Sequence, residues 1–195
     1  MERLPRSFFT RDTITVAQEL LGKVLVRKIG EKEIRARIVE TEAYIGEEDQ
    51  ACHARFGRTK RNAVMYGVAG HAYIYLCYGI HELLNIVTER ELAFGSTPKA
   101  PAAVLIRRII ALEYDRTQNA YLRSKMAKIL GPGSLTKYLQ ITRALNGEDL
   151  TKSGKLWIAK DDYMVKKSQI KSAERIGVAY AGKWAKRRWR FYFDF

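Results

Sequence analysis

The stretch EIRARIVETEAY, at Glu33–Tyr44, decides the fold of this chain. Its residues alternate in kind, as they do in a β-strand whose successive side chains point to opposite faces of a sheet. Strict alternation predicts that the carboxylates at 40 and 42 are buried beside apolar side chains, where desolvation raises a carboxyl pKa and suits it to general-base chemistry. The even positions that would share this face are Ile34, Ala36, Ile38, Glu40, Glu42 and Tyr44.

A shift in strand pairing is the alternative arrangement of the same stretch. A β-bulge at Val39 would exchange the two faces beyond it. Glu40 and Glu42 would then turn to solvent or toward Arg35 and Arg37. Alternation alone leaves both arrangements open.

The rest of the chain extends this strand into a single domain, residues 1–195, without an internal repeat, a low-complexity tract or a Ser/Gly linker. Because strands dominate and helices are inserted between them, the fold class predicted is α+β. Helices are expected from Asp12 to Gly22, over 111–128 and after Gly131. Strands are expected at 23–28, 33–44, 71–78, 83–88, 102–110, 155–159, 176–179 and 189–193.

Charge is the strongest compositional signal. The 195 residues include 35 Lys and Arg against 21 Asp and Glu, a net charge of +14, which favours a polyanionic partner. Residues 160–190 hold ten basic and three acidic residues, whereas residues 31–49 hold three basic and seven acidic. The end KWAKRRWR at 183–190 interleaves tryptophan with basic residues, as nucleic-acid-binding surfaces do, although a charged edge strand has the same pattern.

Other classes of protein fit the sequence poorly. Two cysteines are too few for a disulfide framework or a four-thiolate zinc site, and the histidines match no zinc-ligand spacing, so no metal and no cofactor is expected. The uncharged stretch 62–81 contains glycines, tyrosines and histidines and is a poor membrane span, and the charged start argues against a secretory signal. An intracellular protein without a membrane segment is expected.

The second hairpin, around Gly79-Ile80-His81, contains two tyrosines that are expected to have different surroundings. Tyr75 and Tyr78 must point to opposite faces, and Tyr78 lies at the tip, where a large aromatic ring has no core to enter and more often makes contacts. Asn85 lies among apolar residues and needs hydrogen-bond partners, either in a turn or in a binding site.

Several different short blocks of sequence follow one another along the chain. Their order carries more information than any one block. They are RIVETEAY at 37–44, His53, GRT at 57–59, RNAVM at 61–65, GHAYIYLCYG at 70–79, LNIVT at 84–88, PAAVLIR at 101–107, GPG at 131–133, RIGV at 175–178, AGKWA at 181–185 and WRFY at 189–192. The series resembles the alkyladenine (3-methyladenine) DNA glycosylase family. Two departures stand out: Lys60 replaces a usual proline, and Arg108 replaces a usual small residue.

The resemblance implies a curved antiparallel sheet, a protruding β-hairpin that enters the DNA minor groove, and a damaged purine flipped out of the duplex. It implies that Glu42 deprotonates a water held by Arg107 and by the main chain of Ile176. Tyr44 would stack on one face of the base, and His53 and Tyr75 on the other. Asn85 would lie where guanine carries its exocyclic amine. Tyr78, assisted by Ile80, would fill the gap in the duplex.

The resulting hypothesis is a monofunctional glycosylase that removes alkylated or deaminated purines from double-stranded DNA, acts as a monomer, and lies in the cytoplasm or nucleoid of a prokaryote or the nucleus of a eukaryote. Arg187 and Arg188 are expected to contact the DNA backbone. A non-catalytic, basic nucleic-acid-binding domain is the alternative, and it has no use for an inward-facing Glu42. A glycosylase that also nicks the strand would need a lysine that these blocks do not offer.

Overall fold

The computed structural model describes residues 1–89, 100–112 and 128–195. Within these residues, ten strands form one sheet in which every pairing is antiparallel. The strands are β1 (Glu2–Arg3), β2 (Val24–Ile29), β3 (Lys32–Ile45), β4 (Ala72–Cys77), β5 (His81–Thr88), β6 (Ala102–Ala111), β7 (Lys128–Leu130), β8 (Leu156–Lys160), β9 (Lys171–Ala173) and β10 (Arg190–Tyr192). The α+β class and the two hairpins predicted from sequence are confirmed.

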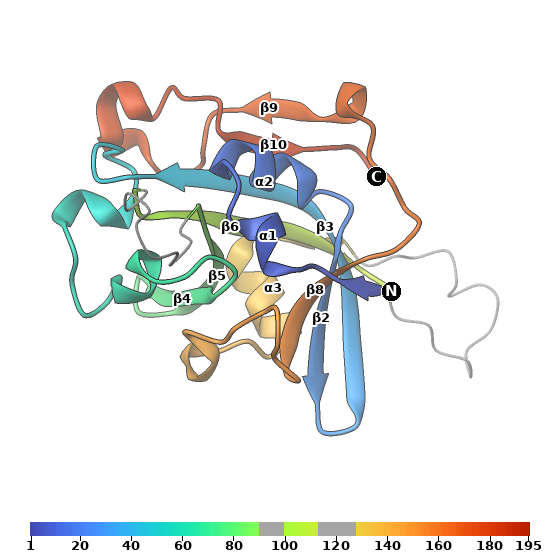
Figure 1. Ribbon diagram of the computed structural model, residues 1–195. Helices are drawn as coiled ribbons and strands as arrows, with labels where there is room; N and C mark the ends of the chain where they lie inside the picture. Colours follow the sequence, from blue (N-terminus) through green and yellow to red (C-terminus); the bar gives the residue numbers. More distant parts are fainter. Residues whose placement is uncertain (90–99, 113–127) are drawn as a thin grey trace.

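The long strand β3 organises the sheet. The main path runs β1-β8-β2-β3-β6-β5-β4, while β10 pairs with the far half of β3 and with β9. Figure 1 shows β9 and β10 lying along β3, with the β2–β3 hairpin extending away from them. One strand thus brings together the N-terminal hairpin, the central sheet and the C-terminal end of the chain.

The described residues include three short α-helices: α1 (Arg6–Phe9), which packs on α2, α2 (Thr13–Glu19) and α3 (Pro132–Tyr138). The side chain of Asp12 caps α2 by accepting a hydrogen bond of 2.8 Å from the Thr15 N–H, as the sequence predicts. Helix α2 packs on β3, β6 and β10, whereas α3 packs on β5, β6 and β7. Apolar side chains from the helices and the sheet form the main core, including Val16, Leu20, Ile38, Ile106 and Leu135. Short 3-10 helices lie within the segments that connect the strands and α-helices: η1 (His53–Phe56), η2 (Ala63–Tyr66), η4 (Arg143–Leu145), η5 (Lys167–Gln169) and η6 (Ala179–Trp184).

Two bulges interrupt the pairing of β3 with β6. Ile38 pairs with Ile109, Glu40 with Arg108 and Thr41 with Ile106, so Val39 and Arg107 have no cross-strand partner in this ladder. Ile38 and Val39 consequently both pack into the main core, while Arg107 and Arg108 both lie beside Glu40. The faces of β3 are exchanged at this point.

The exchange corrects the strict alternation expected for this strand. Beyond Val39 the odd positions face the core, and the hydroxyl of Thr41 donates to the Ala17 carbonyl of α2. Glu40 and Glu42 therefore leave the apolar face, as the bulge alternative requires. They do not turn to solvent or to Arg35 and Arg37, because other elements cover them and their exposed fractions are 1% and 0%.

Two other sequence predictions differ from the structure. Residues 176–179 are not a strand: they form a bend that leads into η6, and the strand lies earlier, at β9. The helix predicted over 111–128 falls mostly outside the described residues, and its two ends, Ala111 and Lys128, belong to β6 and β7.

Candidate active site

One row of paired residues crosses the sheet beneath the site. Glu42 of β3 pairs with Leu105 of β6, Leu105 with Asn85 of β5, and Asn85 with Tyr73 of β4. Directly paired residues of antiparallel strands point to the same face. Since neighbouring strands lie about 4.8 Å apart, the backbones at Glu42 and Asn85 are about 10 Å apart with Leu105 between them.

The carboxylate of Glu42 is fixed by three neighbours. Its Oε1 accepts a 2.9 Å hydrogen bond from the Ile176 N–H and lies 3.4 Å from Nη1 of Arg107. Its Oε2 accepts a 2.7 Å hydrogen bond from the Tyr44 hydroxyl. Each carboxylate oxygen can accept about two hydrogen bonds, so Oε2, with one partner among the described residues, is the oxygen with a lone pair to spare.

Burial raises the pKa of Glu42, against the opposing effects of the Arg107 charge and of the hydrogen bonds from Ile176 and Tyr44. The negative charge of Glu40 adds to the increase. A carboxylate whose pKa is raised by burial is a stronger base than an exposed one, and the donors around it favour its charged form. These are the properties required to take a proton from water.

A buried ion pair carries the segment that supplies the Ile176 N–H. The guanidinium of Arg175 makes two hydrogen bonds to Asp49, of 2.6 and 2.9 Å, and also bonds the carbonyls of Ala43 and Trp184. Both charged side chains are fully buried. Arg175 therefore anchors the backbone next to Ile176, and the sequence blocks gave no sign of its pairing with Asp49, which is 126 residues away.

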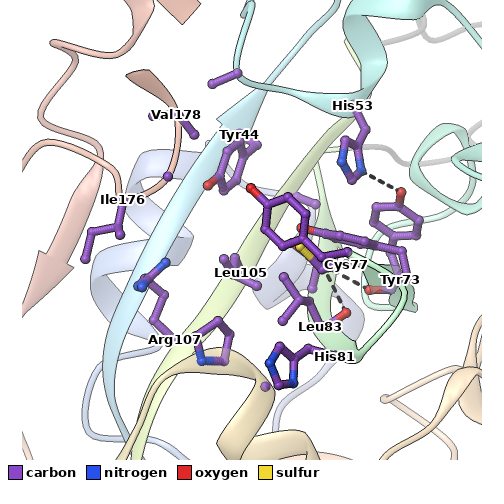
Figure 2. A pocket seen from close by; sticks show the side chains of 18 of the residues that line it. Tyr44, His53, Tyr73, Cys77, His81, Leu83, Leu105, Arg107, Ile176 and Val178 are labelled. Carbon is purple, nitrogen blue, oxygen red and sulfur yellow. Dashed lines mark hydrogen bonds between the residues drawn. The ribbon is translucent and has the colours of Figure 1, made fainter. Parts of the chain in front are cut away.

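Aromatic rings line a cavity of about 590 Å³ above this row. Figure 2 shows Arg107 and Ile176 on one side of it and His53 and Tyr73 on the other, with Tyr44 between them. The rings of His53 and Tyr75 meet edge to face with centroids 4.4 Å apart, and Arg175 lies 4.7 Å from the centre of the Tyr44 ring. The volume falls in the range of small-molecule sites.

The imidazole of His53 is neutral at neutral pH. Burial, assisted by the charges of Arg61 and Arg55, lowers its pKa to about 4. Its Nδ1 is 2.9 Å from the Tyr73 hydroxyl, a hydrogen bond drawn in Figure 2. The rings of His53, Tyr73 and Tyr75 are therefore uncharged, while the guanidinium of Arg61 lies over the Tyr75 ring at 5.2 Å from its centre.

Asn85 is buried, and its partners fix the orientation of its amide. Both neighbours are backbone carbonyls, those of Tyr73 at 3.2 Å and Leu83 at 3.4 Å, so the amide nitrogen must face them. The turn-cap alternative does not describe this arrangement, because the residue lies in the middle of β5 and lines the cavity.

The tip of the β4–β5 hairpin presents two apolar side chains to solvent. Tyr78 is 88% exposed and Ile80 is 75% exposed. Tyr78 and Gly79 both have positive φ, 51° and 73°, and the Ile80 N–H donates to the Cys77 carbonyl, as in the tight turns that suit the twist of a hairpin. A positive φ is unfavourable for a tyrosine, and such strain concentrates at functional sites.

The basic C-terminal end lies beside the cavity rather than in it. Arg187 lies over the rings of Trp184 and Trp189, and Arg188 donates to the backbone carbonyl of Ser172. Both arginines are exposed, so these contacts orient their guanidinium groups while leaving them accessible.

Residues from seven separated positions meet around this cavity. Tyr44, His53, Tyr75, Asn85, Arg107 and Ile176, all selected from sequence, line it, and Glu42 lies directly behind Tyr44 and Arg107. Sequence reasoning did not find the partners of Glu40, which the structure places against Arg107, Arg108 and Arg190. Arg108 thus has a carboxylate partner here.

Among the described residues, no group of three or more His, Cys, Asp or Glu is arranged to hold a metal ion. In the same part of the chain, no helix has the length and apolar character needed to span a membrane.

Comparison with known proteins gives one family. The family model described as methylpurine-DNA glycosylase (MPG) matches residues 7–194. Relatives named "Putative 3-methyladenine DNA glycosylase" match nearly the whole chain, and three of them serve as examples. The protein of Methanocella arvoryzae is 50% identical over 98% of this chain and 92% of its own length. Those of Legionella pneumophila strain Corby and Desulfitobacterium hafniense are 45% and 42% identical, over 98% and 100% of this chain and 94% and 96% of their own lengths.

The fold, the buried carboxylate beside an aromatic cavity and these matches define an enzyme of DNA repair, a DNA glycosylase. The chain belongs to the methylpurine-DNA glycosylase family. The family description and the names of the relatives indicate 3-methyladenine DNA glycosylase activity. The alternative of a non-catalytic nucleic-acid-binding domain is thereby set aside.

Proposed function

We propose that this enzyme flips alkylated or deaminated purines out of duplex DNA and hydrolyses the N-glycosidic bond, leaving an abasic site. Glu42 acts as the general base that deprotonates the attacking water. Arg107 and the main chain of Ile176 hold that water. The observation that carries the proposal is the geometry of Glu42, a fully buried carboxylate directly behind the cavity residues Tyr44 and Arg107, with an oxygen that can accept one more hydrogen bond.

The chemistry needs few groups. An alkyl group on N3 or N7 gives the purine a positive charge, so the base is already a good leaving group. Ordinary glycosidases use one carboxyl as acid and another as base or nucleophile, whereas a cationic leaving group needs no acid. One base for water is then sufficient for an alkylated purine, and Glu42 supplies it, whereas a deaminated purine is neutral and must also gain a proton as it leaves.

The aromatic walls suit a flipped purine. Tyr44 stacks on one face of the base, and His53 with Tyr75 on the other. Uncharged rings attract a cation through their electron-rich faces, and this favours an alkylated purine over a neutral one. Asn85 restricts the position that the exocyclic amine of guanine would occupy, because its buried amide is held by two backbone carbonyls and cannot easily move aside.

The hairpin and the basic end bind the duplex. Tyr78 and Ile80 enter the gap left by the flipped nucleotide, which costs a few kcal/mol to extrude and least where pairing is already weak. Arg187 and Arg188 contact phosphates and release counterions. The enzyme acts as a monomer, because one chain supplies the base, the cavity and the hairpin, and it works in the compartment that holds the genome.

The test is Glu42→Gln, a change that keeps the size of the side chain and an oxygen for the Ile176 N–H. Single-turnover excision should fall by at least about two orders of magnitude, with binding of lesion DNA retained, since a general base contributes about that much. The matched control is Glu33→Gln, the same change at an exposed position of the same strand. Near-normal excision by Glu42→Gln would refute the assignment.

The assay uses duplexes with 7-methylguanine, hypoxanthine or ethenoadenine, scored for abasic sites with and without alkali. Cleavage of the strand without alkali would contradict a monofunctional enzyme. The wild-type rate should fall as pH drops through the raised pKa of Glu42, because protonation removes the base. An ordinary glutamate has a pKa of about 4.3. The acid limb of this enzyme should therefore lie at a higher pH than that value.

A further inference from the structure

Glu40 is a second buried carboxylate on the same face of β3, two residues before Glu42. Its side chain is 2% exposed. Nη2 of Arg108 lies 2.9 Å from its Oε2, and Nη1 of Arg190 lies 3.0 Å from its Oε1. Nε of Arg107 lies 3.6 Å from the same Oε1. Three guanidinium groups therefore surround one carboxylate that the reaction itself does not use.

Arg107 bridges the two carboxylates. Its Nε faces Glu40 and its Nη1 faces Glu42, at 3.6 and 3.4 Å. A guanidinium is a planar group with donors at fixed angles, so a carboxylate at each of two edges sets its orientation more tightly than a single partner could. The bulge at Arg107 makes this possible, since it places Arg107 and Arg108 in succession on the side of the sheet where Glu40 lies.

We propose that Glu40 is a positioning residue of this active site, which ties Arg107 to Arg108 and Arg190 and thereby holds the Arg107 guanidinium in place against Glu42. The inference rests on the proposed function, because it assigns Arg107 to the water and Glu42 to the proton. Glu40 does not touch the reacting atoms. It acts through Arg107.

The arrangement has a consequence for the strength of the base. Without Glu40, nothing on β3 holds Nε of Arg107, and the guanidinium can turn toward Glu42 and pair with it more closely. Glu42 also loses the repulsion from a neighbouring negative charge, which raises its pKa. Both changes stabilise the charged form of Glu42, so the acid limb of the pH profile moves to lower pH.

Apart from Arg107 on β6, whose guanidinium the substitution releases, the groups that face Glu42 keep their contacts when Glu40 is changed. They are Tyr44 on β3, the Ile176 N–H from the bend before η6, and the more distant charge of Arg175, which lies over the Tyr44 ring. Arg190, which pairs with Glu42 across the β3–β10 ladder, points its guanidinium to Glu40. A shift of the acid limb therefore reports the loss of the Glu40 charge together with its contact to Arg107, and the accompanying fall in rate reports the position of Arg107.

The experiment compares Glu40→Gln with wild type and with the Glu33→Gln control in single-turnover excision across pH. We expect the rate constant to fall by roughly tenfold to a hundredfold, since misplacement of a catalytic group by about 1 Å costs up to about that factor. Lesion binding should stay within about twofold, and the acid limb should move to lower pH. Glu40→Asp should recover part of the rate, because it restores the charge.

Glu40→Gln removes the carboxylate that three partly exposed arginines share and can impair folding. The charge-balanced variant Glu40→Gln/Arg108→Gln removes one charge of each sign, and Arg108 is the most exposed of the three arginines at 39%. Its thermal unfolding checks that it is folded, and the same loss of rate and the same shift of the acid limb are expected.

The failures are distinguishable. Wild-type protein that releases no purine overturns the proposed function. Wild-type protein that is active, with folded Glu40 variants whose rate and acid limb match those of Glu33→Gln, overturns the positioning role. A loss of rate with an unmoved acid limb, or a parallel loss of lesion binding, also counts against it, since a structural role alone predicts either result.

Discussion

The buried pair of Arg175 and Asp49 should be among the most stability-sensitive contacts of the molecule. We consider Asp49→Asn, which keeps the shape of the side chain but removes its charge. Asp49 is fully buried and accepts two hydrogen bonds from Arg175 in addition to those from the backbone N–H groups of Ala51 and Ile45. The substitution leaves a guanidinium in the interior without an anion.

The expected magnitude follows from this burial. Removing one partner of a buried ion pair costs about 3 to 5 kcal/mol, because the remaining charge is not solvated. For a chain of this size 1 kcal/mol changes the melting temperature by about 2 to 4 °C, so Asp49→Asn should lower it by about 6 to 20 °C. Excision should fall as well, since Arg175 anchors the backbone that supplies the Ile176 N–H to Glu42.

Thermal unfolding followed by circular dichroism measures the effect, with Glu19→Gln as the control. Glu19 pairs with Arg11 at 2.8 Å, but both side chains are substantially exposed, and such pairs contribute about 0 to 1 kcal/mol. The double variant Asp49→Asn/Arg175→Met should be more stable than Asp49→Asn, because it removes the unpaired charge. A melting temperature for Asp49→Asn equal to that of Glu19→Gln would refute the reasoning.

Two further predictions concern DNA. Tyr78→Ser should weaken lesion binding and reduce the flipped population through the loss of roughly 1 to 3 kcal/mol of stacking, with little change in the salt dependence of binding. Neutralising Arg187 and Arg188 together should instead weaken binding to damaged and undamaged DNA alike. It should also flatten the slope of log affinity against log salt concentration by up to about 2. Fluorescence titrations with ethenoadenine at several salt concentrations separate the two, and equal changes of slope would identify Tyr78 as an ordinary surface residue. Asn85→Ser should raise release of normal guanine relative to lesions, within about 1 to 3 kcal/mol of discrimination, because a shorter side chain opens the position of the exocyclic amine. An unchanged ratio of guanine to lesion release, measured by chromatography of the free bases, would remove Asn85 from selectivity.

The sequence alone determined the features that depend on near neighbours. Alternation over Glu33–Tyr44 predicted the central strand, and the cap at Asp12 predicted the short helix α2, because both patterns arise within a few residues. The exposed position of Tyr78 also follows from local structure, since a hairpin tip has no core to enter.

Tertiary structure decided which face of the central strand the carboxylates occupy. A bulge depends on how β3 registers against β6, more than 60 residues away along the chain, and alternation cannot detect it. The prediction that Glu42 is buried was right, while the assumption of unbroken pairing behind it was wrong. Glu42 is buried by Tyr44, Arg107 and the bend at Ile176 rather than by the apolar face of its own strand.

The charged contacts that support the site were likewise beyond the reach of sequence. Asp49 and Arg175 are 126 residues apart, and Glu40 and Arg190 are 150 apart. An arginine on its own looks the same in sequence whether it is solvated or paired in the interior, because pairing depends on which distant segments the fold brings together. The chemistry of the cavity could therefore be anticipated from residue types, but the positions of its charges were set only when β3, β6, the Arg175 segment and β10 came together.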